Sequence, residues 1–343
     1  MPPHLGHLDL IKFAQENCDL LILAVCSRPK EPIPGSLRFR WMKEIFGSFK
    51  NIKIVQVKAD LPQDKEPSRS ASKIWSRYLL KRFGLIDTIF SSETYGNYLA
   101  EYMEAEHRFC DKKPGKEKIC ATLIRKDPFK YWEYIPQIVR PYFVKKICLY
   151  GPESTGKSRL AKELADYFKT IWVPEFARGY ITKKGNRFDY KDMKKVGIGH
   201  FKSVAEGLKK ANKLLFIDTD LITTVIYSRH YFGQCPDIIQ KLADETKYDL
   251  YLFCDIDLPW QADPQRDLGE RREEFKQIFE SELKKRKIPF ILISGQDRER
   301  LKAAIKAVNN FFGLSDSQTG EFKTSEKPAL KKFCSRLVYN LHS

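Results

Sequence analysis

The sequence contains no long hydrophobic run. Its strongly apolar stretches, such as residues 20–25 and 214–217, are far shorter than the roughly 20 residues that a membrane helix needs. The amino terminus reads Met-Pro-Pro-His and has no basic stretch followed by an apolar one, so no secretory signal is visible. We therefore expect a soluble, cytoplasmic protein that has no membrane partner.

Cysteine pairs are missing as well. The eight cysteines are scattered, with no Cys-x-x-Cys pair and no histidine at zinc-finger spacing, which excludes a zinc finger and a disulfide framework. The sequence also has no internal repeat and no low-complexity tract. With 343 residues, 42% of them hydrophobic and 31% charged, it predicts a globular chain of about two domains.

Acidic residues are too few to balance the basic ones. There are 61 lysines and arginines against 44 aspartates and glutamates, so the net charge is +17, and the ligands are expected to be anions. Nucleic acid and small phosphates both meet that description. The basic residues are spread along the chain, with no zinc-binding fingerprint, RNA-recognition signature or basic arm. The motifs therefore have to decide between the two.

Short apolar runs alternate with amphipathic segments along the chain. Runs that are apolar on every residue predict strands buried on both faces, and their alternation with helices predicts parallel α/β sheets. The predicted strands lie at 20–25, 52–57, 88–90, 146–150, 214–217, 250–254 and 290–293. The predicted helices lie at 7–16, 38–46 and 157–168.

An aromatic stretch with three prolines, DPFKYWEYIPQIVRP at 127–141, interrupts this alternation and marks the domain junction. We predict an amino-terminal domain over 1–143 and a second α/β domain over 144–313. The last stretch, 314–343, is rich in serine, threonine, lysine and glutamate, and is expected to be a mobile polar tail.

The strongest motif lies at 151–158, where Gly-Pro-Glu-Ser-Thr-Gly-Lys-Ser matches G-x-x-x-x-G-K-[ST] between a predicted strand and a predicted helix. Its glycines let backbone N–H groups surround phosphate oxygens, and the helix N-terminus adds a favourable dipole. Lys157 then reaches the β- and γ-phosphates, and the Ser158 hydroxyl joins the shell of Mg²⁺. The predicted ATP contacts of this domain are Gly151, Glu153, Ser154, Thr155, Gly156, Lys157 and Ser158.

Carboxylates near other strand ends are candidates for holding the metal and the substrate that meet the γ-phosphate. Asp218 and Asp220 follow the strand at 214–217, and a carboxylate there could hold Mg²⁺ through water. Glu175 and Arg178, three positions apart, could orient a substrate hydroxyl during phosphoryl transfer. On spacing alone, a surface ion pair or a helix cap is the alternative for each pair.

Arginines cluster further along the chain. Trp260 precedes Arg266, Arg271 and Arg272, and arginines on a mobile loop would suit the departing γ-phosphate, because a guanidinium spreads two hydrogen bonds over its oxygens. A solvated charged helix is the alternative. We predict that Arg266 and Arg272 contact ATP.

The chain opens with His4-Leu5-Gly6-His7 before a predicted helix. Two histidines that flank a glycine at a helix start can both point at one phosphate. Near the end of the domain, Ile119-Cys120-Ala121-Thr122-Leu123-Ile124-Arg125 brings a hydroxyl and a guanidinium to another predicted helix start.

These paired signatures resemble the nucleotidyltransferase superfamily, whose members have a Rossmann-like fold and release pyrophosphate. Together with Asp-Pro-Phe-x-Tyr-Trp-Glu-Tyr-Ile-Pro at 127–136 and the Gly-x-Glu-Ser-x-Gly-Lys-Ser loop, they make the chain similar to bifunctional NadR-type proteins of NAD biosynthesis. The resemblance covers residues 1 to about 313. It extends to the Glu-x-x-Arg-x-Tyr, Ile-Asp-Thr-Asp and Pro-Trp-x-x-Asp segments.

The resemblance implies a two-step salvage enzyme. The carboxy-terminal domain would phosphorylate nicotinamide riboside to nicotinamide mononucleotide (NMN), and the amino-terminal domain would join NMN to ATP, giving NAD and pyrophosphate. No protein nucleophile is needed in the second reaction, so catalysis is positioning and charge neutralisation. Mg²⁺ is the expected cofactor of both reactions, and a homo-oligomer is compatible with the resemblance.

Residue roles follow from the same resemblance. His4, His7 and Arg125 would be catalytic in the transferase domain, and Lys157 and Glu175 in the kinase domain. The transferase would bind ATP through His4, Gly6, His7, Ser92, Glu93, Cys120, Thr122 and Arg125, and NMN through Trp75 and Arg38. The kinase would bind nicotinamide riboside through Glu175, Arg178, Asp220 and Trp260, and the metal through Ser158 and Asp218.

Two departures from the family pattern concern the transferase domain. Family members carry a strand and a Gly-x-Phe-x-Pro turn before His-x-Gly-His, whereas only three residues precede His4 here. We expect the first strand to be missing, which would expose sheet edges and remove backbone donors near the triphosphate. Cys120 also replaces a serine, and a thiol is a weaker hydrogen-bond donor.

Other interpretations remain at this point. The protein could be a kinase alone, with an inactive truncated transferase domain. It could be a nucleotide-sensing regulator, although nucleic-acid binding is not expected because no reader element precedes the His-x-Gly-His motif. It could also be a different P-loop kinase fused to a cytidylyl- or pantetheine-phosphate adenylyltransferase-like domain.

Overall fold

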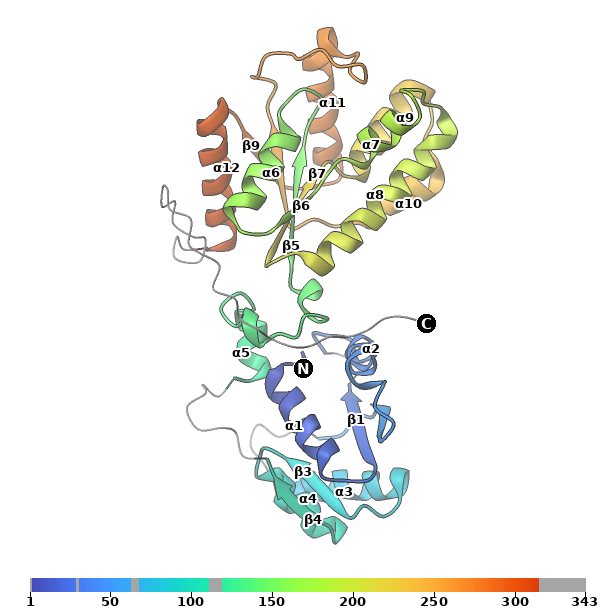
Figure 1. Cartoon of the computed structure of the whole chain (residues 1–343), viewed down its shortest axis with the longest axis vertical. Helices are drawn as coiled ribbons and strands as arrows, with labels where there is room; N and C mark the ends of the chain where they lie inside the picture. The colour runs from blue at the N-terminus through green and yellow to red at the C-terminus, as the bar shows by residue number, and fades with distance from the viewer. Residues whose placement is uncertain (1, 29–30, 63–67, 111–118, 315–343) are drawn as a thin grey trace, which may run out of the picture.

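The computed structural model describes residues 2–28, 31–62, 68–110 and 119–314. In these residues, helices and parallel strands alternate in two parts joined by an irregular segment (Figure 1). The predicted tail falls almost wholly outside the described residues. None of the described helices has both the length and the apolar character that a bilayer span requires.

The amino-terminal part contains two parallel strand pairs, β1 with β2 and β3 with β4, and the described residues do not join the pairs by strand hydrogen bonds. That the first strand of the family pattern is missing stays a prediction. The strands are β1 (Leu21–Ser27), β2 (Ile52–Lys58), β3 (Thr88–Ser91) and β4 (Glu106–Phe109). The helices are α1 (Leu5–Glu16), α2 (Gly35–Phe46), α3 (Arg69–Phe83), α4 (Tyr95–Met103) and α5 (Ala121–Lys126).

The proline-rich junction folds into two short 3₁₀ turns, η1 (Trp132–Tyr134) and η2 (Arg140–Tyr142). Trp132, Ile135 and Val139 of this segment are buried, with Trp132 at 2% exposure, whereas Ile138 and Tyr142 are exposed. Trp132 belongs to one apolar cluster with Trp41 of α2 and Leu215 of the carboxy-terminal sheet. The junction is therefore a packed connection between the two parts.

The carboxy-terminal part is built on one parallel sheet of five strands in the order β6-β7-β5-β8-β9. The strands are β5 (Lys145–Tyr150), β6 (Ile171–Val173), β7 (Leu214–Asp218), β8 (Leu250–Cys254) and β9 (Phe290–Ile293). The helices are α6 (Lys157–Tyr167), α7 (Phe176–Lys183), α8 (Tyr190–Lys210), α9 (Leu221–Phe232), α10 (Asp237–Glu245), α11 (Arg272–Lys285) and α12 (Asp297–Phe312), with a 3₁₀ turn η3 (Gly269–Arg271).

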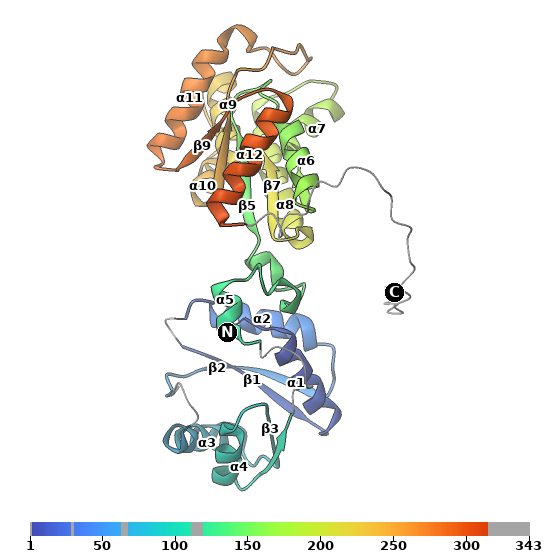
Figure 2. The same cartoon turned by 90° about the vertical axis from the view of Figure 1, so that its left-hand side faces the viewer.

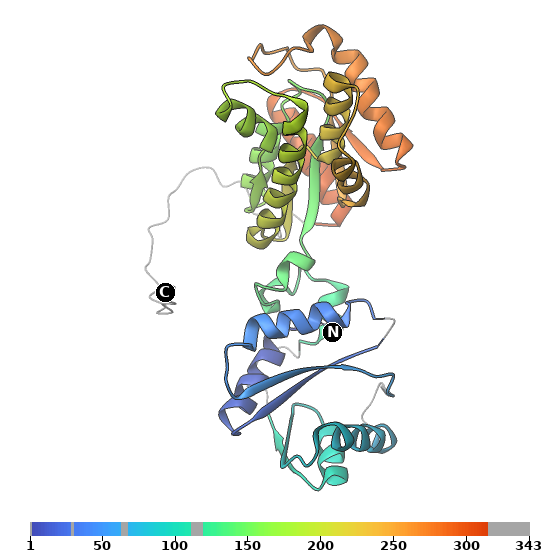
Figure 3. The same cartoon turned by 90° about the vertical axis from the view of Figure 1, so that its right-hand side faces the viewer.

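The central strands are buried on both faces, as their uninterrupted apolar runs predict. Helices α6 and α12 cover one face, where Leu160 and Val308 pack with Ile147 of β5 (Figure 2). Helices α9 and α11 cover the other face, where Val225 and Phe279 are in one cluster with strand residues of β5 and β8. The helices α7 to α9 lie together on this second side (Figure 3).

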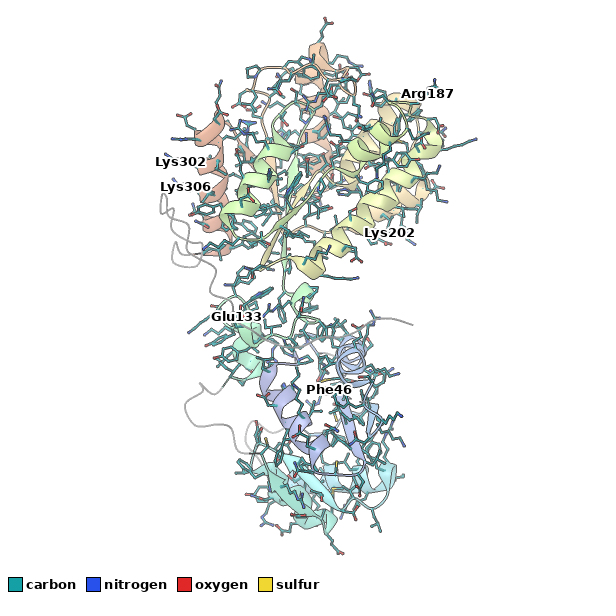
Figure 4. The ribbon with its side chains drawn as sticks, in the orientation of Figure 1. Phe46, Glu133, Arg187, Lys202, Lys302 and Lys306 are labelled. Carbon is teal, nitrogen blue, oxygen red and sulfur yellow. The ribbon has the colours of Figure 1, made fainter. Side chains whose placement is uncertain are left out.

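Basic side chains project from different sides of the carboxy-terminal part. Lys302 and Lys306 point outward from α12, and Lys202 points outward from α8 on the opposite side (Figure 4). The positive charge seen in the sequence is thus distributed over several helices, in keeping with basic residues that are spread along the chain.

Candidate active site

The loop between β5 and α6 has the backbone that its glycines predict. Gly151 has φ +134°, and a Cβ there would lie 2.8 Å from the Cys254 carbonyl oxygen, while Gly156 takes a left-handed φ of +76° just before α6. Lys157 begins α6, and its Nζ donates to the Pro152 carbonyl oxygen at 2.6 Å. The loop therefore directs backbone N–H groups and a lysine toward one point at a helix N-terminus.

A cavity of about 900 Å³ opens at this loop. Its walls come from the loop itself, from α7, α8 and α9, and from the segment after β8. A volume of this size holds a nucleotide-sized ligand. The predicted residues that line it are Glu153, Ser154, Thr155, Gly156, Lys157, Ser158, Glu175, Arg178 and Arg266.

Two carboxylates lie close together beside the loop. Glu175 immediately precedes α7 and lines the cavity; burial, followed by the charge of Asp218, raises its pKa from an ordinary 4.5 to about 7, against the opposing effect of Lys157 and Arg178. Burial also raises the pKa of Asp218, although Lys157 and the Ser158 hydroxyl oppose this. A carboxyl that titrates near neutral pH beside a phosphate loop can, in its ionised form, accept a proton from a substrate hydroxyl.

Both carboxylate oxygens of Asp220 accept hydrogen bonds from other residues of the protein. One carboxylate oxygen accepts from the backbone N–H of Thr223 at 2.9 Å and so caps α9, and the other accepts from the Tyr251 hydroxyl at 2.9 Å. Asp220 is 1% exposed and is not among the residues that line the cavity. The sequence left open whether Asp220 contacts a ligand or caps a helix, and its contacts in the structure are those of a helix cap.

The segment after β8 is tied to the phosphate loop by hydrogen bonds. The backbone N–H of Leu268 donates to Glu153 at 2.8 Å, and the backbone N–H of Gln261 donates to the Ser154 hydroxyl at 3.0 Å. Arg178 of α7 pairs with Asp263 at 2.8 Å. The predicted arginine loop thus lies over the phosphate loop and contacts α7.

The predicted arginines differ in their contacts. Arg266 lines the cavity and donates to the Gln261 carbonyl oxygen at 3.0 Å. Arg272 starts α11 and donates to the Leu258 carbonyl oxygen at 2.8 Å, and its guanidinium lies 5.8 Å from the ring centre of Trp260. Trp260 and Arg272 are outside the residues that line the cavity. Their predicted ligand contacts stay predictions.

Arg300, which the sequence did not single out, supports the loop from α12. It is 3% exposed and donates to the backbone carbonyl oxygens of Thr155 at 3.1 Å and Asp255 at 2.7 Å, and to the Asp257 carboxylate at 2.6 Å. It therefore connects the phosphate loop with the end of β8. No local pattern in the sequence separates Arg300 from the other charged residues of its helix, because these three partners lie 43 to 145 positions away.

In the amino-terminal part, the rings of the two histidines of the motif lie close together at the start of α1, tilted by 47°. The ring centres of His4 and His7 are 3.9 Å apart, and His4 is 6% exposed. A Cβ at Gly6 would lie 3.1 Å from the His4 ring, so a larger residue there would press on it. The glycine thus leaves room for the His4 ring close to the first turn of α1.

The second predicted signature begins α5, which lies near the start of α1 in the views of Figures 1 and 2. Arg125 donates to the Thr122 hydroxyl at 3.1 Å, so the two predicted phosphate ligands are neighbours on one turn. Cys120 is exposed at the N-cap, where its side chain makes no capping hydrogen bond. A cysteine at this position leaves the first N–H groups of α5 without a side-chain cap.

The predicted NMN contacts make internal hydrogen bonds. Arg38 is 8% exposed, pairs with Glu31 and donates to the Cys26 carbonyl oxygen at 2.9 Å at the end of β1. Trp75 of α3 donates through its indole N–H to the Pro62 carbonyl oxygen at 2.8 Å. Both side chains are therefore held in fixed positions, and their contact with NMN stays a prediction.

A hydrogen-bond network that runs from buried Ser91 to exposed Asn97 supports the predicted nucleotide loop after β3. Ser91 shares a hydrogen bond of 2.9 Å with His107, which bonds Asn97 at 2.5 Å, and Ser91 also donates to the Glu93 carbonyl oxygen at 2.8 Å. Although these residue types resemble a hydrolase triad, Ser91 is fully buried and cannot reach a substrate. The network fixes the turn that carries Ser92 and Glu93.

The carboxy-terminal part is a P-loop nucleotide-binding domain. It has a five-stranded parallel sheet, a glycine-rich loop that leads into a helix N-terminus, and a cavity beside them. The family model described as an AAA domain matches residues 146–300. Two crystal structures of NadR protein, one in complex with NR and one with NAD and AMP-PNP, share the fold. Each has a TM-score of 0.76 and is 22% identical in sequence. The match to the NR complex covers 94% of this chain and 95% of that chain. The match to the complex with NAD and AMP-PNP covers 95% of this chain and 96% of that chain.

Curated relatives place the chain in a family. It is 31% identical over 341 residues to the trifunctional NAD biosynthesis/regulator protein NadR of Escherichia coli, which covers 91% of this chain and 81% of that protein. The NadR protein of Salmonella typhimurium is 30% identical over 338 residues, with the same coverage. The chain belongs to the NadR family.

Proposed function

We propose that the chain is a bifunctional enzyme of NAD salvage. Its carboxy-terminal part, over 144–313, transfers the γ-phosphoryl group of ATP to the 5'-hydroxyl of nicotinamide riboside and yields NMN and ADP. Its amino-terminal part, over 1–143, transfers the adenylyl group of ATP to NMN and yields NAD and pyrophosphate. Family membership supports both reactions, and the cavity that joins the phosphate loop to Glu175 is the observation that carries the first.

In the kinase reaction, the riboside binds in the cavity between α7, α8 and α9, with its 5'-hydroxyl at Glu175. Glu175 takes the hydroxyl proton as the oxygen attacks the γ-phosphorus, and the bond from that phosphorus to the oxygen of ADP breaks. Lys157 and the loop N–H groups stabilise the charge on the phosphates. Arg178, held by Asp263, and Arg266 bring further positive charge to the same cavity.

The raised pKa of Glu175 predicts a pH dependence of the kinase reaction. A base must be ionised, so kcat/KM for nicotinamide riboside should rise with pH through about 7 and level off above it, instead of being flat as for an ordinary carboxylate. Glu175→Gln should lower kcat by about 10²–10⁴-fold, the usual contribution of a general base, and abolish the rise. Rates of ADP formation between pH 5.5 and 8.5 would check this, and a wild-type profile that is flat across pH 7 would contradict it.

Oxygen ligands suited to Mg²⁺ lie beside the loop. The Ser158 hydroxyl and the Asp218 carboxylate are hard donors that face each other. No cluster of three or more histidine, cysteine or acidic side chains forms a metal cage among the described residues. Ser158 and Asp218 would hold Mg²⁺, which would neutralise phosphate charge when bound.

For the amino-terminal part we propose a Rossmann-like nucleotidyltransferase. The phosphate of NMN attacks the α-phosphorus of ATP, and the bond to pyrophosphate breaks. His4 and His7, whose rings lie 3.9 Å apart, donate to phosphate oxygens together with Thr122 and Arg125. Residues Ser92, Glu93 and Cys120 contribute to the ATP site, and Trp75 and Arg38 to the NMN site.

Product analysis of the full chain with Mg-ATP and nicotinamide riboside tests the proposal. NAD, ADP and pyrophosphate should all form. NMN and ADP without NAD would show that the kinase acts alone, and the absence of ADP would contradict the proposal. A cytoplasmic location, a homo-oligomeric state and the lack of a nucleic-acid partner remain predictions.

A further inference from the structure

Arg300 of α12 uses all four of its terminal N–H groups within the protein. Nη2 donates to the backbone carbonyl oxygens of Thr155 at 3.1 Å and Asp255 at 2.7 Å. Nη1 donates to the Asp257 carboxylate at 2.6 Å and to the Gly295 carbonyl oxygen at 2.9 Å. Although Arg300 lies in the wall of the kinase cavity, it is 3% exposed and has no terminal N–H left for a phosphate.

The contact with Thr155 fixes the direction of one peptide unit in the phosphate loop. The peptide bond between Thr155 and Gly156 is trans, as are all those of the described residues, and the carbonyl and the N–H of a trans peptide unit point in opposite directions. Since Arg300 holds the Thr155 carbonyl oxygen, the Gly156 N–H points away from α12. Gly156 lines the cavity directly before α6, where the loop receives phosphate.

Glycine leaves this peptide unit free to turn over. Gly156 has φ +76°, and glycine adopts φ values of either sign about equally well, so the peptide unit before it has two accessible orientations. Thr155 is fully buried, and a buried carbonyl oxygen without a hydrogen-bond partner is unfavourable. The hydrogen bond from Arg300 therefore stabilises one of the two orientations.

The other partners of Arg300 hold its guanidinium in place. Asp257 also accepts from the backbone N–H of Gly295 at 2.6 Å, so its carboxylate joins Arg300 to the turn before α12. Asp255 directly follows β8, which pairs with β5, the strand that leads into the phosphate loop. The planar fork of a guanidinium meets these acceptors in a fixed geometry that a lysine ammonium cannot reproduce. The Thr155 carbonyl is thereby tied to the rigid sheet.

We propose that Arg300 is a positioning residue of the kinase site: it selects the orientation of the Thr155–Gly156 peptide unit in which the Gly156 N–H donates to the phosphates of ATP. Oriented backbone N–H groups bind phosphate oxygens and stabilise their charge. Loss of one such donor should weaken the contacts to the phosphates and leave the binding of the base and of the riboside unchanged. The inference deepens the proposed function and rests on it.

The test measures kinase kinetics in the full chain, with the sum of NMN and NAD formed from nicotinamide riboside as the readout. Arg300→Met removes the guanidinium donors and keeps a long side chain. It should raise KM for ATP about tenfold and lower kcat about threefold to tenfold, while KM for nicotinamide riboside stays within about twofold of wild type. Arg300→Lys keeps the charge but cannot meet all four acceptors, so KM for ATP should rise about threefold.

Inhibition by two ligands separates an effect on phosphate contacts from a general one. At saturating nicotinamide riboside, ADP and adenosine both compete with ATP, and only ADP carries phosphates. Arg300→Met should weaken inhibition by ADP about tenfold and leave inhibition by adenosine within about twofold of wild type. Lys302→Gln is the matched control, because Lys302 points outward from the same helix (Figure 4). It should change neither value, and melting temperatures check that each variant is folded.

Asp257→Asn tests the same contact from the other side. It keeps the size of the side chain and one oxygen acceptor, but it removes the charge that holds the guanidinium. Inhibition by ADP should weaken about threefold, and inhibition by adenosine should not change. This variant leaves Arg300 itself in place, so it remains informative if Arg300→Met does not fold.

Several results would overturn the inference. Inhibition by ADP and by adenosine could weaken together in Arg300→Met, which would mean that Arg300 holds the whole nucleotide site in shape. A folded Arg300→Met protein with the wild-type KM for ATP would show that the peptide orientation does not depend on Arg300. If Arg300→Met is unfolded, wild-type inhibition by ADP in both Arg300→Lys and Asp257→Asn would contradict the inference. If wild type forms neither NMN nor NAD, the proposed kinase function fails and the inference fails with it.

Discussion

Lys157→Ala should abolish the phosphorylation of nicotinamide riboside and leave the adenylylation of NMN intact. Lys157 begins α6 at the centre of the phosphate loop and lines the cavity. Removal of one preorganised charge from a phosphoryl-transfer site typically costs 10²–10³ in kcat, and here the substrate phosphates would also lose a binding partner. We expect a loss of at least about 10³-fold in riboside-dependent ADP formation.

The control for this variant is Lys162→Ala, which removes an exposed lysine from the same helix outside the cavity. It should retain wild-type rates in both reactions. NMN-dependent pyrophosphate release by Lys157→Ala should remain within about twofold of wild type, since the proposed transferase site lies in the other part of the chain. Loss of both reactions in a folded Lys157→Ala protein would show that the two-site assignment is wrong.

Four of the five strands of the carboxy-terminal sheet could be predicted from the sequence, because the central strands are buried on both faces, whereas β6 and the helices α7 to α12 were not predicted. Runs such as 250–254 and 290–293 coincide with β8 and β9, and the helix predicted at 157–168 corresponds to α6. The amino-terminal helices α3 and α4 were not predicted. Helix α3 has only three buried residues, Ala71, Ser72 and Ser76, and two of them are serines, so its sequence lacks a clear apolar stripe.

The site was predictable where its residues are contiguous in the sequence. The phosphate loop forms one motif, and its flanking strand and helix are both present. Positions that meet only through the fold gave no signal in the sequence. Arg300 reaches the loop from α12, and His200 lines the cavity from α8, yet in the sequence His200 looks like any polar residue within a long helix. Asp220 was selected because it follows a strand, a location shared by helix caps and metal ligands.

The sequence also does not show which residues of the chain a predicted ligand contact binds within the protein. Arg38 was assigned to NMN by resemblance, yet its guanidinium is paired with Glu31 and bonds the end of β1. A residue can hold a site in shape and still contact the ligand, so this geometry supports a positioning contribution from Arg38 whether or not NMN reaches it. The same argument applies to Trp75 through its bond to Pro62.

His7→Ala should have the reverse effect of Lys157→Ala. His7 lies in the first turn of α1 with its ring 3.9 Å from that of His4, so both rings can donate to one triphosphate at a helix N-terminus. Because adenylyl transfer needs no protein nucleophile, charge stabilisation is the main contribution of the protein, and loss of one such donor should lower NMN-dependent pyrophosphate release by about 10²–10³-fold.

Kinase activity of His7→Ala should stay within about twofold of wild type, so that NMN accumulates from nicotinamide riboside while NAD does not form. Lys12→Ala, which removes an exposed side chain from α1, is the matched control and should make NAD at the wild-type rate. An NAD rate in His7→Ala equal to that of Lys12→Ala would show that His7 is not part of the transferase site. The opposite responses of His7→Ala and Lys157→Ala, measured on the same chain, would demonstrate two independent active sites, because a general loss of folding cannot lower each activity while sparing the other.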